Sequence, residues 1–128
     1  MNKSKYELKT LSYVRRIYKE NIVPCAEGWK ETGKKLGFKQ STINKGCPRN
    51  AFLGLCSSGL VKNIPKGIYT KSIKNRTYAE KAVEILRKNP GFANNPLGLW
   101  KKIQTEEITH NGQMNVVCAL WKNGLIKQ

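Results

Sequence analysis

The chain has 128 residues, of which 24 are Lys or Arg and only 8 are Asp or Glu, so its formal net charge is +16. A hydrophobic content of 39% is typical of a folded protein, and no apolar run approaches the ~20 residues that span a bilayer. These values exclude a disordered chain and a membrane span. The N-terminus lacks the apolar stretch of a signal peptide, so we expect none. A chain of this length buries enough surface to be stable by itself, and we expect one domain over residues 1–128.

Two helices are predicted in the first third of the chain. Ser4 and Glu7 form a capping box, and apolar residues then recur at helical spacing to about Glu20, with Lys9 and its basic neighbours placed off the apolar stripe. Pro24 suits the first turn of a second helix, which Gly37 ends. The polar segment 38–46 is typical of a turn or loop.

A third helix is predicted from Pro48 to about Ser58, with Gly59 as its left-handed cap. Residues 60–70 then hold two short β-prone pieces on either side of a Pro-Lys-Gly turn. We expect a small β-hairpin there, followed by a basic connector over residues 71–76.

In the second half, a capping box at Thr77–Glu80 predicts the start of a helix that stops at Asn89. Asn95 and Pro96 begin another helix, residues 105–112 are a loop or the end of that helix, and a last helix runs from about residue 113 to 122. The apolar positions of all these helices predict a core that includes Leu11, Val14, Trp29, Leu36, Phe52, Leu55, Val83, Leu86, Trp100, Val117, Leu120 and Trp121.

The chain also repeats itself. NAFLGLCSSGLV in the middle matches NVVCALWKNGLI near the C-terminus when Gly59 is set against Gly124, which also aligns Asn50 with Asn115. The order of predicted helices before each copy is the same. We therefore predict a mainly α fold, in which two pseudo-repeated three-helix (helix-turn-helix-like) units form one compact domain.

The first unit would cover residues 4–70 and the second residues 77–127, with the hairpin as a wing after the first. Three helices followed by a basic hairpin resemble a winged helix-turn-helix module, whose third helix enters the major groove of DNA while the wing touches phosphates. That resemblance implies that Arg49 and Asn50, at the start of the third helix, contact bases. The backbone phosphates would be met by Lys39, Lys45, Lys62, Lys66, Lys71, Lys74 and Arg76.

The strong positive charge leaves two kinds of partner open. Nucleic acid, above all duplex DNA, is the leading hypothesis, because polyanions are the usual partners of such basic chains. An inhibitor or accessory module that docks on an acidic protein is the alternative, using the same charge for steering. A basic face concentrated around the helix at Pro48 and the hairpin favours DNA, whereas an even spread of charge favours a protein partner or none. No helix joins a continuous basic face to a strongly apolar one, so no membrane partner is expected.

The four cysteines are Cys25, Cys47, Cys56 and Cys118, and their spacing matches no zinc pattern. With a single histidine in the chain, we expect no metal and no cofactor. Cys56 and Cys118 occupy apolar helix positions, which indicates reduced, buried thiols and a cytoplasmic protein.

Cys47 is the one candidate nucleophile. It precedes a predicted helix between Lys45 and Arg49, and cations and a helix N-terminus both favour a thiolate. A Cys47-dependent enzyme would need a base, and His110 is the only imidazole. We treat this enzyme as the least favoured interpretation, since a cysteine at a helix start and a histidine in a turn explain both residues.

Aromatic residues offer a further way to bind nucleic acid, by stacking on bases. Trp29, Trp100 and Trp121 lie at helical spacings that favour the core. The better stacking candidates are three tyrosines expected to be more exposed, Tyr6, Tyr13 and Tyr69.

Finally, the strings KGCPR at 45–49, AFLGLC at 51–56, GIYT at 67–70 and NGQMNVV at 111–117, with two Leu-Trp pairs, resemble a small uncharacterised bacterial protein family of about this length. The resemblance spans nearly the whole chain. It implies no activity, but it makes residues 45–49 and 111–115 look like equivalents of one another.

Overall fold

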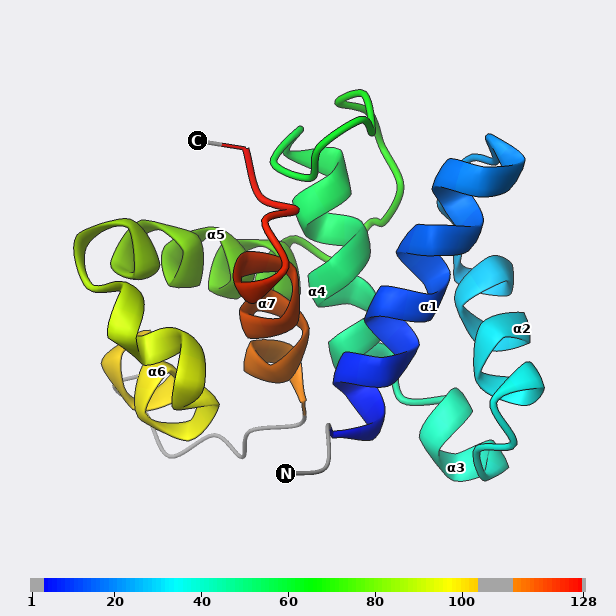
Figure 1. Cartoon of the computed structure of the whole chain (residues 1–128), viewed down its shortest axis with the longest axis horizontal. Coiled ribbons are helices and arrows are strands. Elements are labelled where there is room, and N and C mark those ends of the chain that lie inside the picture. Colours follow the sequence, from blue (N-terminus) through cyan, green and yellow to red (C-terminus); the bar gives the residue numbers. More distant parts are fainter. Residues whose placement is uncertain (1–3, 104–111, 128) are drawn as a thin grey trace.

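A computed structural model of the protein describes residues 4–103 and 112–127. The described residues are mainly helical and contain no strand. In Figure 1, α4 and α7 lie at the centre, with α1 to α3 on one side and α5, η1 and α6 on the other. In chain order the elements are α1 (Lys5–Glu20), α2 (Ala26–Lys35), α3 (Gln40–Ile43), α4 (Gly46–Ser57), α5 (Ile73–Lys88), η1 (Pro90–Asn94), α6 (Pro96–Ile103) and α7 (Gln113–Lys122).

The start of α1 follows the expected cap. Ser4 Oγ accepts a hydrogen bond from the Glu7 amide at 3.1 Å, and Asn21 ends the helix in the left-handed region at φ 52°. The Glu7 carboxylate makes an ion pair with Lys122 at 3.3 Å. The Glu7 side chain therefore links α1 to α7. The capping box predicts instead that it accepts a hydrogen bond from the backbone at the start of its own helix.

Several helix starts differ from the sequence expectation. The second helix begins at Ala26 with Cys25 as its cap, and α3 occupies part of the segment expected to be a loop. The capping box at Thr77–Glu80 is wrong, because α5 already begins at Ile73. Ser72 supplies an earlier cap, whose Oγ accepts from the Asn75 amide.

The expected β-hairpin over residues 60–70 is absent. The physical reason is that its backbone is bonded elsewhere: the Gly67 amide donates to the Ser57 carbonyl, and the Tyr69 amide donates to Ser57 Oγ at 3.0 Å. Asn63 takes a left-handed turn at φ 63°. The segment is therefore fastened to the end of α4 and has no second strand of its own.

Both central helices end in the same way. Gly59 after α4 and Gly124 after α7 have φ values of +75° and +68°, which glycine adopts most readily. In each case the glycine amide donates to a carbonyl three residues back and the following leucine amide to one five residues back. The aligned sequence copies thus fold into equivalent helix ends.

The residues that follow these two ends pair with each other. Val61 and Ile126 form an antiparallel bridge, flanked by hydrogen bonds of 2.8 Å from Lys62 to Leu125 and from Lys127 to Leu60. Val61 and Ile126 are aligned positions of the two copies, and both are buried. Val61 therefore finds its backbone partner at the far end of the chain, which is the second reason why no hairpin forms.

The helices on the two flanks cross over to the opposite copy. The longest helix of each half lies on the central helix of the other half, α1 on α7 and α5 on α4. Asn115 of α7 donates to Ser4, the cap of α1, at 3.5 Å. Its aligned counterpart Asn50 accepts from Thr70, whose Oγ1 also accepts from the amide of Ser72, the cap of α5.

The core contains most of the residues expected there. The prediction that Leu36 lies in the core is wrong, since this residue is 39% exposed, and Trp121 is only partly buried. Tyr13 is fully buried, where it packs edge-on against Trp29 and donates to the Cys25 carbonyl at 3.1 Å. It is therefore part of the core and unavailable for base stacking. No helix within the described ranges combines the length and apolarity needed to cross a membrane.

The two glycine caps give a test of the fold. Gly124→Ala is expected to cost about 1 kcal/mol of stability, because alanine disfavours a positive φ and the site is otherwise open. Gly59→Ala should cost more, since its Cβ would also lie 3.2 Å from Cβ of Lys66. Urea unfolding of both variants measures this order, and equal stability of wild type and both variants would contradict the cap assignment.

Candidate nucleic-acid interface

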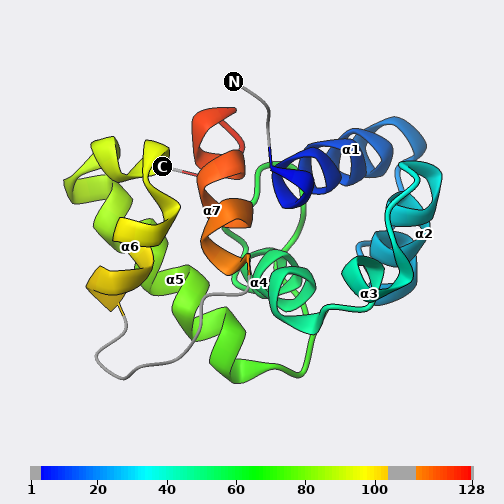
Figure 2. The ribbon, with the colours of Figure 1, turned by 90° about the horizontal axis from the view of Figure 1, so that it is seen from below.

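Four helices begin in one region of the molecule. Tyr6 of α1 lies against Gly112, just before α7, where an added Cβ would be 2.6 Å from the Tyr6 ring. Gln113 of α7 donates to Asn75 of α5 at 3.4 Å. Together with the contacts of Asn50 and Asn115, these links connect the starts of α1, α4, α5 and α7 in a chain of contacts. In Figure 2 the starts of α4 and α7 lie between those of α1 and α5.

A helix start carries positive partial charge, because its first N–H groups have no partner within the helix. The start of α4 lacks a side-chain cap, since its cap residue is Lys45, whose side chain cannot accept a hydrogen bond. The convergence therefore brings several positive helix ends together, and such ends bind anions readily.

Cationic side chains surround these helix ends. Lys5 and Lys45 are exposed, and their Nζ atoms lie 5.5 and 6.0 Å from the centre of the Tyr6 ring. We call the region the helix-start face and define it by five residues at the beginnings of α1, α4 and α5: Lys5, Lys45, Arg49, Lys71 and Lys74. Lys5 was missed from the sequence, because nothing local to it shows that α1 begins beside α4.

The nine predicted nucleic-acid residues do not form one group in the structure. Lys62 and Lys66 follow the C-terminal end of α4, roughly 18 Å from its start at about 1.5 Å per residue. Lys39 caps the short helix α3. Arg76 packs its backbone and side chain against Gly54 and pairs with Glu80 at 3.5 Å, so it supports the contact between α4 and α5. The remaining predicted residues are Lys45, Arg49, Asn50, Lys71 and Lys74, and they lie near the start of α4 or α5.

The winged helix-turn-helix interpretation is wrong. Residues 60–70 form no wing, and the helix that would enter the major groove is the central helix of the fold, with every residue from 51 to 57 buried. Arg49 and Asn50 are partly exposed at its first turn, where Asn50 already accepts a hydrogen bond from Thr70 at 2.8 Å. A helix enclosed in this way has no face left for a groove.

The positive charge extends beyond the helix-start face. Further exposed cations lie on α1, α2, α5, α6 and α7, namely Arg15, Lys19, Lys34, Lys35, Lys81, Arg87, Lys88, Lys101, Lys102 and Lys122. The density of lysines alone therefore does not single out one face. What distinguishes the helix-start face is the combination of cations with linked helix starts, of which the start of α4 has no side-chain cap.

The cysteines match the expectation of unpaired thiols. All four are free, and Cys56 and Cys118 are buried. Burial raises the pKa of both thiols, that of Cys118 to about 12. Within the described ranges, no three His, Cys, Asp or Glu residues gather in a way that could hold a metal ion.

Cys47 lies in the first turn of α4 and is partly exposed. Its proposed base, His110, lies outside the described residues, so the structure gives no geometry for that pair. A Cys47-dependent reaction stays a prediction.

Five buried side-chain donors have no acceptor within the described structure: Tyr6 Oη, Lys9 Nζ, Arg16 Nη1, Trp29 Nε1 and Arg49 Nε. Arg16 is already paired with Glu20 and Glu31 through its other nitrogens, which leaves four side chains to be explained. Lys9 is fully buried, with its Nζ 4.9 Å from the centre of the Trp29 ring. Burial, with a smaller contribution from the charge of Arg49, lowers the pKa of Lys9 from 10.5 to about 8. The sequence had placed Lys9 off the apolar stripe, although it falls between Tyr6 and Tyr13 on the buried face.

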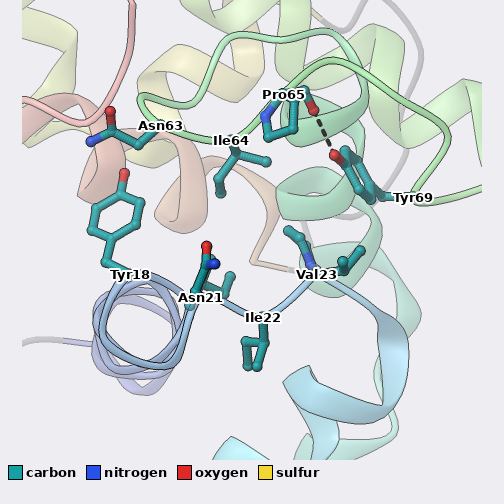
Figure 3. Close-up of a pocket in the computed structure, with 10 residues that line it drawn as sticks. Tyr18, Asn21, Ile22, Val23, Asn63, Ile64, Pro65 and Tyr69 are labelled. Atoms are coloured by element: carbon teal, nitrogen blue, oxygen red, sulfur yellow. Dashed lines mark hydrogen bonds between the residues drawn. The ribbon is translucent and has the colours of Figure 1, made fainter.

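A separate cavity of about 370 Å³ lies at the other end of α1. The loop at residues 21–24 forms one wall, and residues 63–65 with Tyr69 form the other (Figure 3). Tyr69 donates to the Pro65 carbonyl at 2.6 Å, which fixes that wall. Val23 is 70% exposed at its edge, and Ile68, one residue before Tyr69, is 89% exposed.

Fold and surface together define a small, strongly basic helical protein with a convergence of helix starts on one face. The chain matches the model of a family of unknown function (DUF6979) over residues 1–127 and belongs to that family. This agrees with the resemblance to a small uncharacterised family. No curated protein and no solved structure matches the chain.

The buried lysine gives a second test. Lys9→Met should raise the free energy of unfolding at pH 7 in a phosphate-free buffer by about 1–3 kcal/mol, because it removes a buried donor that has no acceptor. As the pH rises from about 8 towards 10.5, the free energy of unfolding of the wild type should increase relative to that of the variant. In this range Lys9 is neutral in the folded state, while the unfolded chain still binds the proton. Urea unfolding across this pH range measures both effects, and a less stable variant would show that Lys9 has a partner in solution.

Proposed function

We propose that the protein binds nucleic acid, with duplex DNA as the leading target, through phosphate contacts of the helix-start face. The observation that carries this proposal is the convergence of four helix starts among exposed lysines. Phosphate oxygens accept hydrogen bonds both from backbone N–H groups at helix starts and from Lys and Arg side chains. In this proposal neither the α4 helix nor a wing reads bases, and affinity comes from the backbone.

The carboxylates near this face are few and engaged. Glu7, in the first turn of α1, pairs with Lys122, and its side chain is only 14% exposed. Glu80 accepts from Ser58 and Arg76 one turn and more beyond the start of α5. Because both carboxylates are already paired, neither competes with an approaching phosphate for the cations of the helix-start face.

Symmetry favours a duplex over a single strand. We infer that the chain consists of two pseudo-repeated helical units related by an approximate two-fold axis between α4 and α7. The paired segments at Val61 and Ile126 and the matched Asn50 and Asn115 contacts support this. A two-fold arrangement of positive helix ends suits duplex DNA, whose two strands are themselves related by two-fold symmetry.

The test compares two triple variants that remove the same amount of charge. Lys5→Ala/Lys45→Ala/Lys74→Ala removes cations of the helix-start face, and Lys35→Ala/Lys88→Ala/Lys101→Ala removes exposed cations from other helices. Binding to a random duplex is followed by fluorescence anisotropy over a range of salt. The slope of log affinity against log salt should flatten by about 0.9 for each phosphate that the first triple variant no longer neutralises, and stay near the wild-type value in the second.

Two results would contradict this proposal. Absence of wild-type binding at low salt would remove nucleic acid as the partner. An equal loss of affinity in both triple variants would mean that the overall charge acts without a defined face.

Docking on an acidic protein is the second candidate, and the cavity in Figure 3 favours it. The exposed apolar residue Val23 lines this cavity, and exposed Ile68 precedes the lining residue Tyr69. The exposed lysines Lys19, Lys62 and Lys66 stand within a few residues of the lining segments in the sequence. A partner that carries an apolar anchor between carboxylates would match that combination.

This candidate has its own test. A labelled peptide of alternating Glu and Leu should bind the wild type at low salt and lose affinity for Val23→Asp, because the new carboxylate repels the peptide. Ser41→Asp places the same charge on an exposed residue of α3 and is the control. Equal affinities of the two variants for the peptide would exclude the cavity as the docking site.

A further inference from the structure

The buried donors around Lys9 point to a specific ligand. Lys9 Nζ has no hydrogen-bond acceptor in the described structure, and it lies against the face of Trp29 and the space above Gly33. A Cβ on Gly33 would lie 2.9 Å from Lys9 Nζ. A side chain at that position would thus collide with the ammonium group.

Arg49 is a second cation with a buried nitrogen, Nε, that lacks an acceptor within the described structure. It stands in the first turn of α4, and its charge acts on Lys9. Its Nη2 lies 3.4 Å from the position of a Cβ on Gly46, the first residue of the helix. The guanidinium therefore lies beside the start of α4, which has no side-chain cap.

These buried groups are chemically one-sided. Lys9, Arg49, Tyr6 and Trp29 each carry a donor, and none of these four buried atoms has an acceptor within the described structure. Unsatisfied buried donors and unpaired buried cations cost stability, so such groups in a native protein need an explanation such as a bound ion. An anion with several acceptor oxygens would satisfy donors from side chains and from the helix start together.

We propose that Lys9 and Arg49, at the start of α4, form a recessed site for a single phosphate group. Arg49 is the more exposed of the two residues and lies on the solvent side, so it meets the phosphate first. This site goes beyond binding along the nucleic-acid backbone, because it recognises a single terminal or free phosphate, which has more unesterified oxygens than a phosphodiester. The phosphate comes either from the terminus of a nucleic acid or from a free phosphate compound.

The first experiment measures thermal unfolding against inorganic phosphate, with sodium chloride used to keep the ionic strength constant. The wild type and Lys35→Met, a control on an exposed lysine of α2, should show a saturable rise in Tm, because a ligand of the folded state stabilises it. Lys9→Met should show only the weak, unsaturable rise that phosphate causes in most proteins. Equal curves for Lys9→Met and the wild type would overturn the proposal.

The second experiment identifies the source of the phosphate and separates this site from the proposed function. If the source is a nucleic-acid end, the wild type should bind a 5′-phosphorylated duplex several-fold more tightly than the 5′-hydroxyl duplex, and Lys9→Met should bind both alike. If the source is a free compound, saturable binding of inorganic phosphate persists with no preference between the duplexes. Lys9→Met should leave the salt slope for the 5′-hydroxyl duplex unchanged, whereas an absent phosphate effect in both experiments would refute the site.

Discussion

The contact between α4 and α7 is the interaction on which the rest of the molecule depends. Most residues of both helices are buried, and both helices end at a left-handed glycine followed by a segment that pairs with its counterpart. Because these two helices occupy the centre, α1 and α5 each lie on the central helix of the other half. This crossing places the starts of α1, α4, α5 and α7 in one region, so the helix-start face is a direct consequence of the core.

That arrangement is costly for the isolated protein. Like charges and positive helix ends repel one another, and a net charge of +16 adds to this repulsion. Lys9 adds a buried cation that has no counterion within the described structure, and Arg49 stands near it. Proteins commonly give up stability at sites that act on a ligand, and phosphate is the ligand that would remove these costs together.

Local signals in the sequence predict some helix ends, because a cap is made by neighbouring residues, but they misplace the start of α5, which lies at Ile73. Ser4, Gly59 and Gly124 behave as expected, and the alignment of the two copies anticipates their matching ends. The hairpin could not be judged locally, since the partner of Val61 is Ile126 at the far end of the chain.

The functional face was only half predictable for the same reason. Lys45 and Arg49 were found from their place at a helix start, but Lys62 and Lys66 were grouped with them through a wing that does not form. Lys9 breaks the apolar face between Tyr6 and Tyr13, and that interruption was the one signal of a buried cation.

The most direct measurement is an NMR titration of backbone amides with duplex DNA. Salt-reversible shifts gathered at the first turns of α1, α4, α5 and α7 are predicted, whereas shifts centred on the cavity beside Val23, or spread evenly over the surface, would contradict the helix-start face as the binding site.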